Sequence, residues 1–388
     1  MAGYQVGAHA LSGLLPIAKF SAMLQAIVVW RLELNLIELK QKMTSTPQRE
    51  DSGAKTNSRY HYQALCGLVL VMEKHKLGGD YAIVFEFHDD IAVFDDPIAP
   101  SSVEFYQVKS KASGNWTPAS LTKRDKAKGD DARSFLGKMY ENVISFGDNV
   151  KSATFLSNAP ANFAPDSKQK FCLTECDGEK LAEITKRLEE EFSGEDAIKS
   201  ELLWVSRTDL SLDDADTHAR GKLEAFVVEN LGSVEFSLRA LYQAISDECD
   251  SKSRAASADL TDFSDVISKR GITRADANSW LENVRSTVEC PRWEDISSEI
   301  HLPALQKIRL SREWNTYRVA VLNPNEAIRK VRRRISDIIN EGGMDSLSLN
   351  DLMLKVYAEI EAEARLELKA ATDEQIMVMV LYETHSVK

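Results

Sequence analysis

Three side chains near the ends of two predicted strands have the types and the spacing for phosphodiester hydrolysis. Asp90 follows the first strand, and Gln107 and Lys109 lie two residues apart near the end of the next. Because side chains alternate along a strand, Gln107 and Lys109 share one face, and strand pairing would bring Asp90 beside them. A carboxylate, an amide oxygen and the main-chain carbonyl of Val108 can hold Mg²⁺ or Mn²⁺, while a lysine activates water and offsets charge in the transition state. The same alternation also fits an ordinary surface strand.

The elements that must position these residues follow from hydrophobic periodicity. Apolar residues recur every three to four positions over 59–76, which predicts an amphipathic helix that ends at a Gly-Gly pair. Aromatic and β-branched residues predict a first strand at 81–88, continued over 91–94, and a second at 103–110, paired as a hairpin with a long loop. The further predicted elements of this part are a helix at 132–146, a strand at 152–156, a helix at 179–192, a strand at 202–207 and a helix at 220–230. Helices between strands predict a mixed α/β sheet.

Two adjacent carboxylates compete for the role of the acidic ligand. Strand alternation places Ile83, Phe85 and Phe87 on one face of the first strand, and Glu86, His88 and Asp90 on the other. This alternation favours Asp90 over Asp89. A bend at the Asp-Asp step would reverse the preference, so both remain candidates.

The charge of the chain is unevenly placed for a nucleic-acid partner. Among 388 residues, 48 Lys and Arg against 60 Asp and Glu give a net charge of −12, which argues against a uniformly basic DNA-coating surface. Between residues 105 and 140, however, eight basic residues face only three acidic ones. This segment is predicted to contact the phosphate backbone through Lys111, Lys123, Arg124, Lys126 and Lys128. The alternative is a solvated loop and helix face.

The second half of the sequence has helical periodicity almost throughout. The predicted helices lie at 234–250, 260–269, 274–284, 304–314, 326–340 and 349–370. A basic cluster at 329–334 is expected to face solvent or a partner rather than DNA. The apolar run at 375–382 fits either a docking or self-association surface or a last helix packed on its own core.

The chain is predicted to have three parts. Residues 1–42 form a non-native or dispensable extension, with Met43 as the native start; 43–232 form the α/β domain, and 233–388 a helical assembly domain. Pro16 and Lys19 interrupt the apolar stretch near the beginning, so neither a membrane span nor a signal peptide is expected. Five scattered cysteines indicate a reducing compartment, the cytoplasm, and no structural metal.

Four sequence blocks in order carry a family resemblance: 50–65 (EDSGAKTNSRYHYQAL), 86–95 (EFHDDIAVFD), 105–111 (FYQVKSK) and 155–163 (FLSNAPANF). Together they resemble the dsDNA-endonuclease domain of CBASS antiphage effectors, over roughly residues 50 to 232. The order Asp90 and then Gln107-x-Lys109 is similar to the Mrr-like variant of the PD-(D/E)xK nuclease signature, in which Gln replaces the second acidic residue.

The resemblance implies a restriction-endonuclease-like fold and specific roles for individual residues. Asp90 corresponds to the metal-binding Asp, Gln107 to the variant second ligand and Lys109 to the catalytic Lys. Gln63, with Arg59 one turn earlier, corresponds to the first-helix motif that approaches the site. Since Gln carries no charge, Glu86 or Asp89 is a candidate to support the metal, and activity could require an assembled state.

Architecture and length resemble the nuclease effector subunit of Lamassu defence systems. This resemblance implies an SMC-like ATPase and a small third subunit as partners, with double-stranded DNA as substrate and homo-oligomers on activation. The expected function is therefore a Mg²⁺-dependent DNA endonuclease of bacterial defence. The alternative is a non-catalytic DNA-end or partner-binding subunit that keeps the nuclease fold, and an RNA target is not excluded by the residues.

Overall fold

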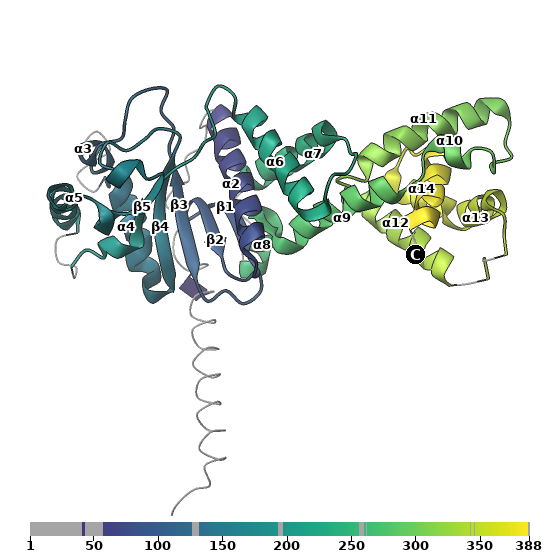
Figure 1. Ribbon diagram of the computed structural model, residues 1–388. Helices are drawn as coiled ribbons and strands as arrows, with labels where there is room; N and C mark the ends of the chain where they lie inside the picture. The colour runs from purple at the N-terminus through teal and green to yellow at the C-terminus, as the bar shows by residue number, and fades with distance from the viewer. Residues whose placement is uncertain are drawn as a thin grey trace, which may run out of the picture.

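A computed structural model describes residues 41–42, 57–125, 132–192, 197–255, 260, 262–341, 343–344 and 346–386. A central sheet with helices on both faces forms a sheet body, and a group of helices follows it along the length of the molecule (Figure 1). The strands are β1 (Ala82–Phe87), β2 (Asp89–Phe94), β3 (Val103–Val108), β4 (Val150–Ser157), β5 (Lys170–Cys172), β6 (Leu203–Arg207) and β7 (Gly271–Thr273). The expected mixed α/β sheet with flanking helices and a helical C-terminal region is confirmed.

The sheet has the order β5-β6-β4-β3-β2-β1-β7. Strands β1, β2 and β3 pair antiparallel in succession, while β3, β4 and β6 are mutually parallel. Parallel strands need crossover connections, and helix α4 (Phe135–Phe146) supplies the one between β3 and β4. The carboxyl ends of β3, β4 and β6 therefore lie at one edge of the sheet, the edge formed by strand ends rather than by an outer strand. The start of β2 lies at the same edge.

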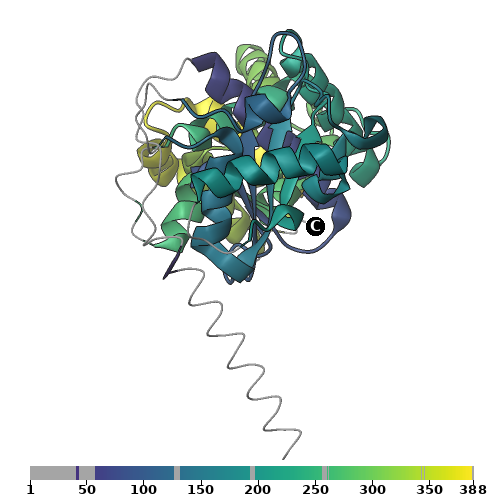
Figure 2. The same cartoon turned by 90° about the vertical axis from the view of Figure 1, so that its left-hand side faces the viewer.

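Two hydrophobic cores cover the two faces of this sheet. One joins it to α2 (Asn57–Leu77), α6 (Ala215–Leu231), α7 (Leu238–Ser253) and α9 (Arg274–Glu289). The other joins it to α4 (Phe135–Phe146), α5 (Gly178–Glu191) and α8 (Phe263–Arg270). The shorter elements are α3 (Pro118–Leu121) and the 3₁₀ turns Gly147–Asn149, Pro165–Ser167, Leu173–Glu175 and Ser200–Leu202. Figure 2 shows the same sheet body end-on, with the helical region behind it.

The prediction of one strand continuing through the Asp-Asp step is wrong. The chain reverses at His88, so β1 and β2 form a tight hairpin in which Phe87 pairs with Asp89. Glu86 and His88 both have positive φ, at 49° and 63°. The predicted alternation also breaks there, because Phe85 faces the α2 side of the sheet and Phe87 the α4 side.

The sheet body extends beyond the predicted boundary at 232. Helix α7 packs in the same core as α2, and β7 pairs with β1 as an edge strand that the helical periodicity did not predict. A third hydrophobic core begins only at Cys290. The change from the sheet body to the helical region thus lies near Cys290 rather than at residue 233, because helices that cover a sheet have the same period as helices that cover one another.

The helical region packs around the last helix. It contains α10 (Trp293–Ile296), α11 (Ala304–Ala320), α12 (Glu326–Asn340), α13 (Leu349–Leu368) and α14 (Asp373–Ser386). The apolar run at 375–382 lies in α14, and its residues from Ile376 to Tyr382 are all buried. Of the two alternatives for this run, the structure therefore shows the last helix packed on its own core.

The basic cluster on α12 is largely neutralised within the helical region. Arg332 pairs with the buried Glu383 at 2.7 Å, while Lys330 pairs with Glu367 at 3.5 Å. Arg334 lies 3.7 Å from Glu363 of α13. These ion pairs show that most of the cluster serves contacts between helices.

Residues 1–40 and Met43 lie outside the described residues, so the predicted extension and start are not placed. In the part of the chain that the structure describes, no helix combines the length and the apolar character that crossing a bilayer requires. All five cysteines are buried and free.

Candidate active site

The predicted site residues converge on one carboxylate oxygen at the sheet edge. Oδ2 of Asp90, at the start of β2, accepts hydrogen bonds from Nε2 of Gln107 and, at 2.7 Å, from the backbone N–H of Val108. Nζ of Lys109 donates to the same oxygen at 2.9 Å. The sequence-based expectation that strand pairing brings these residues together is met, although they approach through β2 and β3 rather than through β1.

The ion pair between Asp90 and Lys109 is withdrawn from water. The Asp90 side chain is 4% exposed and that of Lys109 is 10% exposed. The ammonium group also lies 5.9 Å above the ring of Phe135, from the first turn of α4. Because both charges have lost most of their hydration, such an ion pair is stable only when its geometry is good and additional hydrogen bonds satisfy the two groups.

Asp89 points to a different partner from Asp90. Its Oδ2 accepts a hydrogen bond of 3.0 Å from Nδ2 of Asn142 in α4, and its Oδ1 accepts the backbone N–H of Asp90 at 2.9 Å. The structure thus brings Asp90, not Asp89, to Gln107 and Lys109. In the hairpin, Phe85 pairs with Ile91 and Phe87 pairs with Asp89, so Glu86 lies across from Asp90.

Helix α2 brings a further predicted residue into the interior of the sheet body. Gln63 is 3% exposed, and its Oε1 has no hydrogen-bond partner among the described residues. Arg59, one turn earlier, is half-buried. One turn later, burial raises the pKa of Cys66, and the nearby carboxylate of Asp90 contributes in the same direction. Helix α2 therefore passes close to Asp90, as the family resemblance implies.

The donor set at Asp90 fits a hard divalent cation. Asp90 supplies a carboxylate, Gln107 an amide and Val108 a main-chain carbonyl, which are the oxygen donors that Mg²⁺ prefers. A half-turn of the Gln107 amide would exchange Nε2 for Oε1 beside Asp90. Among the described residues, no group of three or more His, Cys, Asp or Glu could hold a metal ion. A metal here would thus depend on amide and carbonyl oxygens beside one carboxylate.

The predicted phosphate-contacting residues are only partly brought to this edge. Lys111 stacks over Trp116, with Nζ 4.0 Å from the ring centroid, and donates to the carbonyl of Asn115 at 2.8 Å. Lys123 and Arg124 line a hollow of about 1230 Å³ that also touches Phe135. Lys126 and Lys128 lie outside the described residues.

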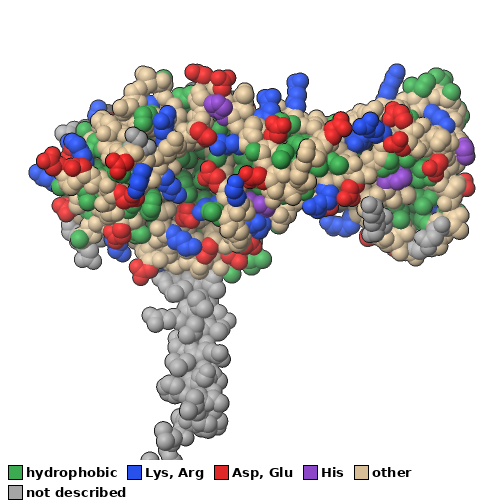
Figure 3. Space-filling view, in the orientation of Figure 1, with side chains coloured by type: hydrophobic (Ala, Val, Ile, Leu, Met, Phe, Trp, Pro, Cys, Tyr) green, Lys and Arg blue, Asp and Glu red, His purple; other side chains and the backbone are tan. Residues whose placement is uncertain are grey.

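Acidic side chains balance the basic ones around this hollow. Its lining includes Lys123, Arg124, Lys186 and Arg187, and equally many carboxylates: Asp125, Glu183, Glu190 and Glu191. Figure 3 shows acidic and basic side chains interspersed over the visible face of the whole molecule. The described surface beside the site is therefore no uniform basic track.

Two residues at the same edge were not singled out from the sequence. Asn158, after β4, accepts the backbone N–H of Lys111 at 3.0 Å and donates to its carbonyl at 2.8 Å, which fixes the chain after β3. Arg207 ends β6, pairs in register with Ser157, and donates to the carbonyl of Asn158 at 3.2 Å. The sequence feature that could have identified both residues is their position at the carboxyl end of a parallel strand.

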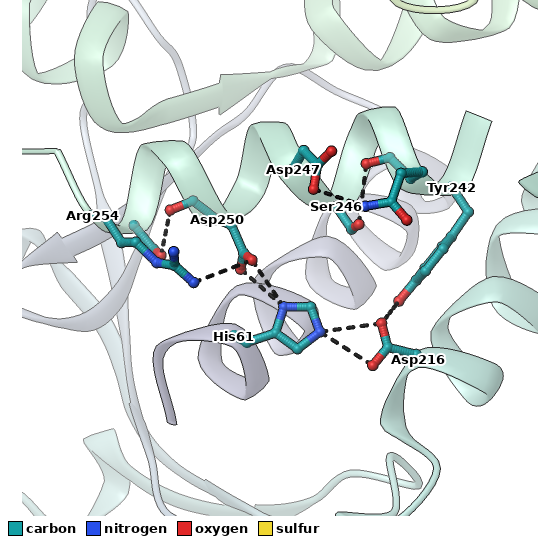
Figure 4. A network of polar contacts seen from close by, with 9 residues as sticks. His61, Asp216, Tyr242, Ser246, Asp247, Asp250 and Arg254 are labelled. Atoms are coloured by element: carbon teal, nitrogen blue, oxygen red, sulfur yellow. Dashed lines mark hydrogen bonds and ion pairs between the residues drawn. The ribbon is translucent and has the colours of Figure 1, made fainter. Parts of the chain in front are cut away.

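A polar network fixes the start of α2 against α6 and α7 (Figure 4). Nδ1 of His61 lies 3.0 Å from a carboxylate oxygen of Asp250, and Nε2 lies 3.1 Å from one of Asp216. Tyr242 donates to Asp216 at 2.7 Å, and Arg254 approaches Asp250 at 3.4 Å. The hydrogen bond to Asp250 raises the pKa of His61 to about 9, with Asp216 adding to the shift and burial opposing it. The imidazole is therefore a cation at neutral pH.

Replacing His61 with glutamine is expected to weaken the fold at pH 6.5 but not above pH 9. A histidine with a higher pKa in the folded state stabilises fully below its unfolded pKa of about 6.5 and loses that effect as the pH rises through about 9. Because the side chain is 30% exposed, we expect a loss of about 1 kcal/mol at pH 6.5. Urea unfolding at both pH values measures it, with His301→Gln, an exposed histidine of the helical region, as control. An equal loss at both pH values would contradict this account.

The comparison with known families agrees with the geometry. A family model described as the Cap4 dsDNA endonuclease domain matches residues 51–253. No curated protein and no solved structure matches the chain. The matched segment contains β1 to β6, α2 and all of the residues that converge on Asp90. Since it covers more than half of the 388 residues, the chain belongs to the family of the Cap4 dsDNA endonuclease domain.

Proposed function

We propose that this chain is a Mg²⁺-dependent endonuclease effector of bacterial antiphage defence. Its active site, centred on Asp90, cleaves the backbone of double-stranded DNA. The observation that carries the proposal is the convergence of Gln107, Val108 and Lys109 on one buried carboxylate oxygen, within a chain of this nuclease family. Asp90, Gln107 and Val108 are the proposed ligands of Mg²⁺ or Mn²⁺, and Lys109 is the proposed catalytic lysine.

Each residue has a separate task in this proposal. A bound Mg²⁺ would supply Lewis-acid stabilisation of the phosphate and favour deprotonation of the attacking water. Asp90 fixes Lys109 through the 2.9 Å ion pair, so that Nζ can orient the water and offset the negative charge that develops on the phosphate. Phe135 covers the ammonium group and keeps bulk water from the pair.

The residues proposed to bind the DNA backbone lie at the same edge of the sheet. Lys111 and Arg207 flank the site from the ends of β3 and β6, and Lys123 is exposed on the neighbouring hollow. With a net charge of −12 and a hollow in which carboxylates balance the basic groups, the lone subunit should bind naked DNA weakly. Productive engagement then requires an assembled state, such as a homo-oligomer or a complex with partner subunits.

We assign partner binding to the helical region. Its core is separate from the two cores of the sheet body, which supports a distinct role. The resemblance in architecture and length to Lamassu effectors supports an SMC-like ATPase and a small third subunit as partners in the cytoplasm. The gene neighbourhood tests this assignment: an SMC-like ATPase gene beside this one supports it, whereas a cyclic-nucleotide synthase gene points to a CBASS assembly instead.

Plasmid cleavage by the assembled protein is expected to require a divalent metal and Lys109. Chelation with EDTA should abolish nicking, Mg²⁺ or Mn²⁺ should restore it, and Lys109→Ala should reduce the rate about 100-fold or more. Lys151→Ala is the matched control, because Lys151 is an exposed lysine near the start of β4. Gel assays of supercoiled plasmid, alone and with candidate partners, measure this.

Three outcomes of this assay would overturn the proposal. Absence of nicking in every assembly would favour a non-catalytic DNA-end or partner-binding subunit that keeps the fold. Full activity of Lys109→Ala would remove the catalytic site from this edge. Faster cleavage of an RNA duplex of the same length would change the substrate class.

A further inference from the structure

A buried arginine from outside the matched family segment reaches the hairpin that carries Asp90. Arg270 is the last residue of α8 and is 3% exposed. Its Nη1 donates to the backbone carbonyl of Glu86, and its Nη2 donates to the carbonyl of Ala255 at 2.6 Å. One guanidinium group thus joins the β1–β2 hairpin to the chain that follows α7.

The carbonyl that Arg270 holds belongs to a residue in an uncommon backbone conformation. Glu86 has φ of 49°, in the left-handed region that a residue with a side chain seldom adopts outside Asn, Asp and Gly. Such a residue persists only where its surroundings over-determine it. The buried guanidinium is a tertiary contact that can do this, and Glu86 lies across the hairpin from Asp90.

The corner that presents Arg270 is itself fixed. Gly271 follows at once, pairs with Val84 as the first residue of β7, and approaches α8 closely. A Cβ atom on Gly271 would lie 2.6 Å from the carbonyl oxygen of Ile267. The guanidinium is therefore held on a rigid helix-to-strand junction beside β1.

We propose that Arg270 is a positioning residue of the nuclease centre: by holding the Glu86 carbonyl, it sets the hairpin so that Asp90 meets Val108 and Lys109. This inference rests on the proposed function and adds a determinant from a segment beyond residue 253, where the family match ends.

The test compares the two arginines that flank β7. Arg274, in the first turn of α9, also donates to backbone carbonyls, those of Lys74 and His75, at 3.2 and 2.9 Å. These carbonyls lie near the end of α2, at the opposite end of that helix from Gln63. Arg274→Lys therefore removes comparable contacts without touching the hairpin of Asp90.

Arg270→Lys is expected to lower kcat for plasmid cleavage about 10- to 100-fold with little change in KM, because small misplacements of reacting groups cost that much. Arg274→Lys should keep kcat within about threefold of the wild type. Hydrogen exchange of the peptide over residues 84–91 should become faster in Arg270→Lys alone. This second readout needs no catalysis, so it tests the positioning role even if the wild type cleaves nothing.

Two results would overturn the inference. The first is a folded Arg270→Lys protein in which both kcat and the hydrogen exchange of the hairpin are unchanged. If the wild type cleaves plasmid in the same assay, this result overturns the inference about Arg270 but leaves the proposed function intact. The second is global unfolding of Arg270→Lys but not of Arg274→Lys, since Arg270 would then determine the fold rather than the placement of Asp90.

Discussion

Replacing Asp90 with asparagine is expected to reduce plasmid cleavage at least about 100-fold while the protein remains folded. Asparagine keeps the size of the side chain and an oxygen for the Val108 N–H, but it removes the charge that a metal and Lys109 require. Asp90→Ala removes the acceptor as well. It would leave the ammonium group of Lys109, only 10% exposed, without its counter-ion, which typically costs about 3–5 kcal/mol.

The adjacent carboxylate provides the matched comparison. Asp89→Asn changes the same atoms one residue earlier, where the partner is Asn142, so we expect it to reduce cleavage less than about tenfold. Plasmid nicking and thermal unfolding of Asp90→Asn, Asp90→Ala and Asp89→Asn separate the effects on rate from those on stability. Equal rate losses in the two asparagine variants would mean that the acidic ligand cannot be assigned to Asp90 alone.

The spacing of the site residues was readable from the sequence, because it depends only on strand alternation and pairing. Gln107 lies in β3 and Lys109 directly follows that strand, while the acidic step begins β2, the strand that pairs with β3. The helix of α2 and the crossover helix α4 were equally clear, since their apolar stripes face a sheet. These features are local or depend on a single pairing.

The hairpin itself could not be predicted. No Gly or Asn marks the turn at His88, and the positive φ of Glu86 coincides with a contact from Arg270, 184 residues later. Turn propensity therefore gave no signal, whereas tertiary contacts set the backbone. The choice between Asp89 and Asp90 also depended on this turn, which is why strand parity alone left it open.

The limits of the sheet body were hidden for a related reason. Strand β7 has three residues and follows directly on α8, so helical periodicity runs almost unbroken across it. The basic residues of α12 gave no sign of their partners, since Glu367 and Glu383 lie on other helices. Charge patterns identify exposed faces, but pairing between distant helices requires the packed structure.

Adding a single methyl group is expected to have opposite effects at two helical glycines, Gly67 in α2 and Gly221 in α6. A Cβ atom on Gly67 would lie 2.1 Å from Cε1 of Phe85, a fully buried ring of β1. Gly67→Ala gains about 1 kcal/mol of helix propensity, but overpacking in a core typically costs about 1–3 kcal/mol and here forces the ring to move. We therefore expect a net loss of up to about 2 kcal/mol, and a larger one for Gly67→Val.

Gly221 in α6 is the matched control on another helix. A Cβ atom there meets nothing within 4 Å, so Gly221→Ala should stabilise the protein by about 0.5–1 kcal/mol. Urea unfolding of both alanine variants measures the sign of each change in the free energy of unfolding. The double variant Phe85→Leu with Gly67→Ala should lose less stability than the sum of the single changes, because the smaller side chain leaves room for the methyl group. If Gly67→Ala were as stabilising as Gly221→Ala, helix α2 would not be seated on β1 through this contact, and the placement of Cys66 near Asp90 would lose its physical basis.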